Sequence, residues 1–84
     1  MNLTDAEKAY RQIKRQIITT ELSPGVVISE AQLMEELKLG RTPIREAIKQ
    51  LQAEDFITVT PRRGMFVTDI SITDLSQLFE VRIE

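Results

Sequence analysis

Two arginines one helical turn apart are the residues best suited to binding chemistry in this chain. Arg41 and Arg45 lie in segment 40–55, where apolar residues recur at helical spacing: Ile44, Ala47, Ile48 and Leu51. An arginine fork matches the O6 and N7 acceptors of guanine in the DNA major groove. A helix that packs on a core and turns a basic N-terminal end outward is typical of DNA recognition. We therefore predict a recognition helix over residues 42–55.

The start of this helix is predicted from its capping residues. Thr42 is a favourable N-cap, and Pro43 would follow at the first helical position, where its missing N–H loses no bond. The cap hydroxyl and the positive end of the helix suit a phosphate, so Thr42 is expected to combine capping with phosphate binding. We expect Arg45 to contact a base, Arg41 a base or a phosphate, and Lys49 a phosphate or solvent.

A basic hairpin is predicted after this helix. From residue 56 the apolar spacing changes to two, which predicts strands over 56–60 and 65–68 joined by the turn 61–64. Arg62 and Arg63 would lie at its tip, where Arg62 or Arg63 would reach the minor groove or its flanking phosphates, and Gly64 would allow close backbone approach.

Two earlier helices must support these residues. The first is predicted over 5–20, with Thr4 and Glu7 at capping-box spacing; the second runs from the cap Ser29 to about Lys38 and carries Gln32 at the same spacing. A short extended segment is expected at 26–28. The predicted fold is mainly α with a small β-hairpin: a winged helix-turn-helix, a three-helix bundle plus a wing, in a domain spanning 1–69.

The last residues predict a separate element. Segment 70–84 begins with a third capping box, Ser71 and Asp74, and its apolar pattern continues to Glu84. We expect a linker and the first helix of a truncated C-terminal helical effector or dimerisation domain. The alternative is a C-terminal helix that packs back on the first domain.

Charge is unevenly distributed along the 84 residues. The formal net charge is −2, but the acidic excess lies after residue 68, and the preceding part is slightly basic. Local clustering governs attraction to phosphates more than total charge does. The competing interpretation is that the basic side chains of the candidate interface are solvated, or paired with Glu46 or Asp55. These side chains are Arg41, Arg45, Lys49, Arg62 and Arg63.

Composition argues against other classes of function. The chain has no Cys and no His, which removes the usual thiolate and imidazole metal ligands and the commonest general base. It also lacks a Gly-rich phosphate loop, a signal peptide and an apolar run of about 20 residues. We expect no enzyme activity, no metal and no cofactor in this segment, and a cytoplasmic location.

In these motifs the sequence resembles the N-terminal domain of the GntR family of bacterial transcription regulators. The most specific match is the run Arg-Thr-Pro-Ile-Arg-Glu-Ala at 41–47, supported by segments 22–25, 28–30 and 63–67. Segment 74–82 resembles the opening of the helical effector domain of the FadR-like (FCD) subfamily.

The resemblance implies a dimeric repressor or activator that reads a palindromic operator in double-stranded DNA. A small-molecule effector, such as an organic acid, would bind a C-terminal domain, and this fragment alone would be a monomer or weak dimer. The family's operator contacts correspond to Arg41, Thr42, Arg45, Arg63 and Gly64. Two positions depart from the family: Ala31 replaces a common polar or basic residue, and the turn usually written Gly-Val-Ser-Arg is 38–41 here, with its glycine two places later.

A second class of function is compatible with the same predicted hydrophobic core. A winged helix can serve as a protein–protein interaction module without DNA binding. Such a module would need an exposed apolar patch in place of the arginine cluster.

Overall fold

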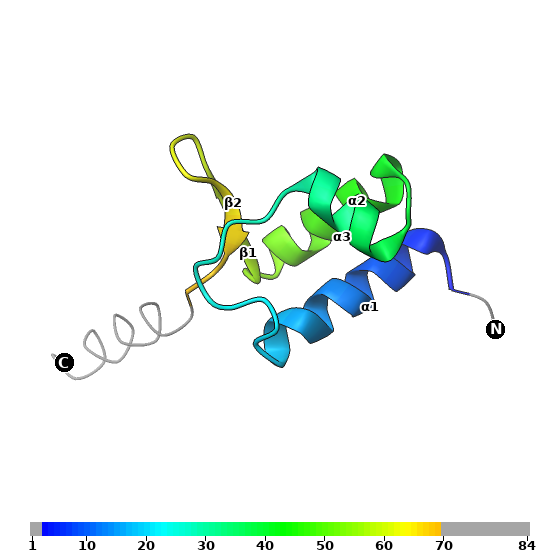
Figure 1. Ribbon diagram of the computed structural model, residues 1–84, viewed down its shortest axis with the longest axis horizontal. Coiled ribbons are helices and arrows are strands. Elements are labelled where there is room, and N and C mark those ends of the chain that lie inside the picture. The colour runs from blue at the N-terminus through cyan, green and yellow to red at the C-terminus, as the bar shows by residue number, and fades with distance from the viewer. Residues whose placement is uncertain (1–2, 70–84) are drawn as a thin grey trace, which may run out of the picture.

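A computed structural model describes residues 3–69 of the chain. Three helices, α1 (Asp5–Ile18), α2 (Glu30–Leu37) and α3 (Arg41–Ala53), precede strands β1 (Ile57–Thr60) and β2 (Gly64–Val67) (Figure 1). The predicted winged helix-turn-helix order is therefore confirmed. The predicted helix beginning near Ser71 lies outside the described residues. Within 3–69, no helix is long and apolar enough to cross a membrane.

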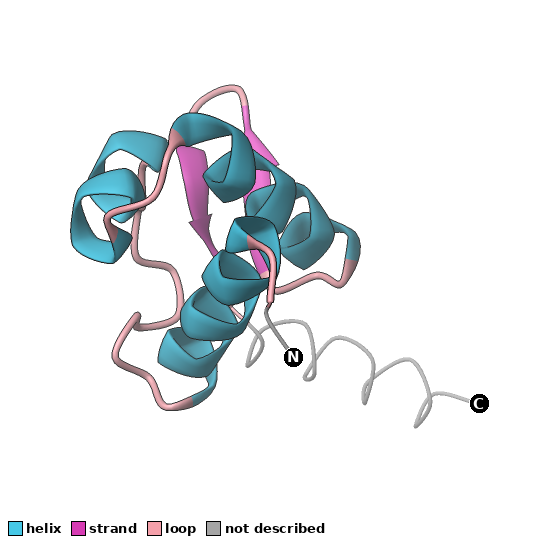
Figure 2. Ribbon diagram, turned by 90° about the vertical axis from the view of Figure 1, so that its right-hand side faces the viewer, coloured by secondary structure: helices cyan, strands magenta, loops and turns pink. Residues whose placement is uncertain are grey.

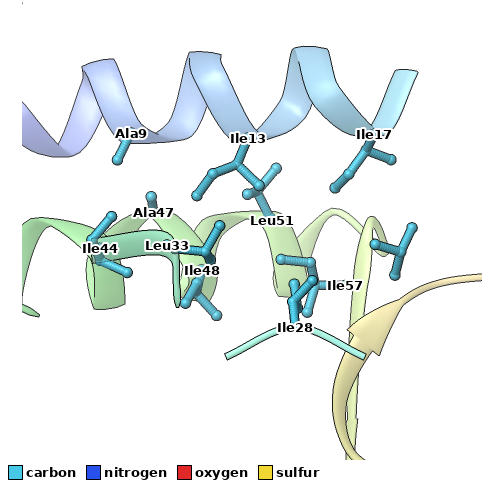
Figure 3. Close-up of a cluster of buried hydrophobic side chains, with 11 residues drawn as sticks. Ala9, Ile13, Ile17, Ile28, Leu33, Ile44, Ala47, Ile48, Leu51 and Ile57 are labelled. Atoms are coloured by element: carbon cyan, nitrogen blue, oxygen red, sulfur yellow. The ribbon is translucent and has the colours of Figure 1, made fainter. Parts of the chain in front are cut away.

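The hydrophobic core lies mainly between α1 and α3. Their facing residues are Ala9, Ile13 and Ile17 on α1 and Ile44, Ala47 and Leu51 on α3, as Figure 3 shows. Leu33 of α2, Ile28 before it and Ile57 of β1 close the cluster, each with at most 4% of its surface exposed. Fully burying one such side chain stabilises a fold by about 1.5–3 kcal/mol, so this packing fixes the orientation of α3.

Helix α1 begins as predicted and ends two residues early. Thr4 Oγ1 accepts from the Glu7 amide at 3.1 Å, and the Glu7 carboxylate accepts from the Thr4 amide at 2.9 Å. Hydrogen bonding to the Glu7 carboxylate, first from the Thr4 amide and then from the Thr4 side chain, lowers the pKa of Glu7 from its ordinary value. The predicted end at Thr20 was wrong, because Thr20 has a φ of 64°, a left-handed conformation that a helix does not continue through.

Helix α2 has one half of its predicted capping box. The Ser29 hydroxyl accepts from the Gln32 amide at 3.1 Å, which confirms Ser29 as the N-cap. The Gln32 side chain does not complete the box, since it donates to Glu36 at 3.4 Å along the helix. The helix ends at Leu37, and Lys38 turns the chain with a left-handed φ of 58°.

Helix α3 starts one residue earlier than predicted. Gly40 is its N-cap, with an extended backbone and no side-chain hydrogen bond, so the assignment of Thr42 as N-cap was wrong. Gly40 takes this role because its carbonyl accepts the Ile44 amide at 3.4 Å. Pro43 is consequently third in the helix rather than first. Its missing N–H is tolerated there as well, because amides of the first turn have no partner within the helix.

The same helix ends at Ala53 rather than Asp55. Asp55 has a φ of 68°. The Asp55 amide donates to the Gln52 carbonyl at 3.0 Å, and the Phe56 amide donates to the Leu51 carbonyl at 2.8 Å. This pair of bonds is a Schellman motif, which satisfies the last carbonyls and directs the chain into β1.

The hairpin, called the wing below, comprises β1, β2 and the connecting residues 61–63. The strands are antiparallel, with Ile57 opposite Val67 and Thr60 opposite Gly64. The predicted hairpin is confirmed, but its strands span 57–60 and 64–67, so Gly64 belongs to β2 rather than to the turn. Its φ of 77° suits the close of a three-residue hairpin loop.

The predicted extended segment at 26–28 joins the wing to the helices. Val27 forms a bridge with Phe66 of β2, and the Ile28 amide donates to the Met65 carbonyl at 2.9 Å. Figure 2 shows the hairpin lying against the helical bundle. Because segment 26–28 leads directly into α2, the positions of the wing and of α2 are coupled.

Candidate nucleic-acid interface

The outer face of α3 and the wing enclose an open groove of about 660 Å³. Its lining comprises Glu30, Thr42, Arg45, Glu46, Ile48, Lys49, Gln52, Val59 and Met65. On α3, positions 42, 45, 49 and 52 form an exposed stripe opposite the buried one. The structure thus brings three predicted site residues, Thr42, Arg45 and Lys49, into one concave surface.

Arg45 points into this groove and is paired across to α2. Its Nε lies 3.0 Å from Glu30 Oε2, and 60% of the Arg45 side chain remains exposed. The alternative that Arg45 pairs with Glu46 or Asp55 was therefore wrong in its choice of partner. This contact engages Nε, and the guanidinium also carries two terminal Nη groups that can donate hydrogen bonds.

The first turn of α3 presents the remaining helical candidates. Arg41 and Thr42 are exposed, whereas Pro43 is half-buried. Arg41 does not line the groove; it lies beyond it, at the N-terminal end of the helix. Amides of this first turn and the helix dipole attract anions, so this end of α3 is suited to a phosphate oxygen.

The two arginines of the wing tip have different environments. Arg62 is exposed in the hairpin loop. The Arg63 guanidinium lies 4.1 Å from the centroid of the Phe66 ring, and its Nη2 donates to the Gly25 carbonyl at 3.4 Å. Arg63 is therefore stacked on the wing itself, and neither arginine lines the groove, nor does Gly64.

The groove carries balanced charge. Its ionisable residues are two cations, Arg45 and Lys49, and two anions, Glu30 and Glu46. Within 3–69, no cluster of three or more Asp, Glu, Cys or His residues could hold a metal ion.

Sequence reasoning missed several lining residues. Gln52 could have been found, since it continues the exposed helical stripe three residues after Lys49. Glu30 could not, because its place opposite Arg45 depends on how α2 packs against α3. Val59 and Met65 enter the groove through the placement of the wing, which local spacing does not specify.

A helix-turn-helix with an attached wing and an arginine-bearing outer face on its third helix defines the winged-helix class of DNA-binding domains. Residues 5–67 match the family described as "Bacterial regulatory proteins, gntR family". The chain belongs to the GntR family of bacterial regulatory proteins.

Individual relatives agree with this assignment. The chain is 31% identical over 75 residues to an uncharacterised HTH-type transcriptional regulator of Agrobacterium vitis, covering 89% of this chain and 44% of that protein. It is 37% identical over 65 residues to the Nta operon transcriptional regulator of Aminobacter aminovorans, covering 77% of this chain and 31% of that protein. The chain thus spans less than half the length of these relatives.

A solved structure shares the fold. The crystal structure of AraR(DBD) in complex with operator ORR3 matches with a TM-score of 0.71, at 23% identity over 81% of this chain and 83% of that chain. At this identity the likeness shows the fold.

Proposed function

We propose that this domain reads an operator sequence in double-stranded DNA, with α3 in the major groove and the wing tip, residues 61–64, at the minor groove. The observation that carries the proposal is the exposed stripe of α3, which places Thr42, Arg45 and Lys49 in one groove. The buried opposite face holds that stripe in a fixed orientation. AraR(DBD), which has the same fold, was crystallised in complex with operator DNA.

The candidate DNA-binding residues of α3 have individual proposed roles. Arg45 contacts a base, because it lies in the groove and its terminal nitrogens can donate to guanine O6 and N7. Arg41 contacts a base or phosphate from the exposed end of the helix. Thr42 and Lys49 contact phosphates, and Pro43 shapes the first turn.

The wing is proposed to contact the minor groove or its phosphates through Arg62 or Arg63. The stacking of Arg63 on Phe66 favours Arg62 as the contact and Arg63 as a support for the wing. Gly64 allows the loop backbone to approach the duplex closely, because glycine has no Cβ.

The whole protein is proposed to be a cytoplasmic, metabolite-responsive regulator of the FadR-like (FCD) subfamily. Residues 1–69 would form the DNA-binding domain, and 70–84 would open a helical effector and dimerisation domain, as their sequence pattern predicts. A homodimer would then present two wings and two α3 helices to a palindromic operator. The small-molecule effector would bind outside the DNA-binding domain.

Selection of bound duplexes from a random DNA pool tests this function, followed by titration of the enriched duplex against salt. We expect one enriched half-site and an affinity that falls steeply with salt, because phosphate contacts release counterions. An enriched pool indistinguishable from the starting pool would contradict the proposal. A protein–protein module would instead show no duplex preference and an affinity for its partner that varies little with salt.

A further inference from the structure

We propose that Glu30 is a specificity-determining positioning residue, which holds Arg45 so that only its terminal nitrogens are offered to a base. This inference rests on the proposed DNA-binding function. It assigns a role to Glu30, an acidic side chain in the groove that would face the negatively charged duplex. Such a charge weakens attraction to phosphates, so we infer that its contribution is to selectivity rather than to affinity.

The backbone around Glu30 is well anchored. Ser29 caps α2 immediately before it, and the Ile28 amide is bonded to the Met65 carbonyl of the wing. Ile28 and Leu33, on either side in sequence, are 4% and 1% exposed. The carboxylate therefore projects into the groove from a position fixed by both the core and the wing.

The contact with Arg45 is directional. Glu30 Oε2 lies 3.0 Å from Nε, the nitrogen nearest the aliphatic stem of Arg45. A guanidinium presents its donors in a rigid planar fork, so fixing Nε also fixes the direction of the edge formed by the two Nη atoms. That edge is the one that can bridge two acceptors of a single base. A flexible exposed arginine is thereby oriented before the duplex arrives.

The carboxylate also acts against unspecific binding. With Glu46 it balances the charges of Arg45 and Lys49 in the groove, which reduces sequence-independent attraction to phosphates. A phosphate placed against Arg45 would lie close to Glu30 and be repelled, whereas a base edge carries no net charge. Discrimination therefore has both an attractive and a repulsive component.

The test compares Glu30→Ala and Glu30→Gln with the wild-type chain. The control is Glu35→Gln, an exposed acid of the same helix that does not line the groove. Two probes are used: a duplex enriched by the wild-type chain from a random pool, and a scrambled duplex of equal composition. Thermal unfolding of each variant establishes that it is folded at the assay temperature.

We expect Glu30→Ala to lower the ratio of enriched to scrambled affinity about tenfold, with tighter binding to the scrambled duplex, and Glu30→Gln to have an intermediate effect. Glu35→Gln should leave the ratio unchanged. Pools selected by Glu30→Ala should lose preference at the same base position as those selected by Arg45→Ala. In an Arg45→Ala background, Glu30→Ala should change the ratio no further.

Two results would overturn the inference. One is an equal loss of affinity for both duplexes, which would mean that Glu30 only stabilises α2. The other is a full effect of Glu30→Ala in the Arg45→Ala background. If the wild-type chain enriches no duplex, the proposed function fails first, and that result is distinguishable from either of these.

Discussion

Lys38 occupies a backbone conformation that suits glycine, and Lys38→Gly is expected to stabilise the domain. Its φ and ψ of 58° and 44° are left-handed, at the turn between α2 and α3. A residue with a Cβ destabilises the folded state by about 1–2 kcal/mol in this conformation. Glycine avoids that cost but has more freedom in the unfolded chain, which offsets about 0.5–1 kcal/mol. With the middle of each range, the net gain in the free energy of unfolding is about 0.5–1 kcal/mol.

Thermal unfolding followed by circular dichroism measures this gain. In a domain of this size 1 kcal/mol shifts the midpoint by about 4–8 °C, so Lys38→Gly should raise it by about 2–8 °C. Lys38→Ala is the matched control, because it removes the same charge and keeps the Cβ; its midpoint should stay near that of the wild type. A midpoint for Lys38→Gly at or below that of Lys38→Ala would refute the reasoning.

Four further substitutions have defined outcomes. Arg62→Ala should reduce the slope of log affinity against log salt by about one unit without lowering the melting midpoint. Arg63→Ala should instead lower the midpoint, because it removes a stacking contact that contributes about 0.5–1 kcal/mol. Gel-shift and melting curves that show the reverse would exchange the roles of the two arginines. Hydrogen bonds from Thr4 lower the pKa of Glu7 in the folded state. The ionised carboxylate therefore stabilises the fold at pH values above the ordinary pKa of 4.5, and this stabilisation is lost as the pH falls through the lowered pKa. Glu7→Gln should therefore flatten the decline of the melting midpoint below about pH 4.5, and an unchanged decline would count against this. Gly40→Ser should raise the midpoint by roughly 1–3 °C through a new N-cap, since its Cβ would meet only Pro43 Cδ at 3.9 Å; a lower midpoint would show that the cap does not form.

Local chemistry accounts for the parts of the fold that were predicted. The caps Thr4 and Ser29 and the change of apolar spacing at residue 56 each depend on neighbours within a few residues. These signals located α1, α2 and the wing, and the helical spacing of apolar residues located α3, because each of these patterns is encoded by residues a few positions apart.

The errors occurred where a local preference competed with another. Thr42 is a good cap by type, but Gly40 adopts the required extended conformation two residues earlier. Asp55 continued the helical pattern, yet its left-handed backbone closes the helix. In both cases the sequence offered two acceptable boundaries, and the packing of α3 selected one.

The candidate site depends more heavily on tertiary structure. The exposed stripe of α3 was largely predictable, since it is the complement of the buried one. The pairing of Arg45 with Glu30 joins residues fifteen positions apart, and the stacking of Arg63 on Phe66 depends on the course of the wing. Neither has a spacing signature, so only the structure could show them.

The measurement that tests the central claim most directly is operator binding by Arg45→Ala. Arg45 is exposed and lies off the buried stripe, so the variant should fold like the wild type. Its preference for the enriched duplex over a scrambled one should fall about tenfold or more, through loss of discrimination at one base position. Arg11→Ala, an equal charge change on the exposed surface of α1, should keep most of the preference. Full retention of duplex preference by Arg45→Ala would contradict the account that α3 reads DNA through this groove.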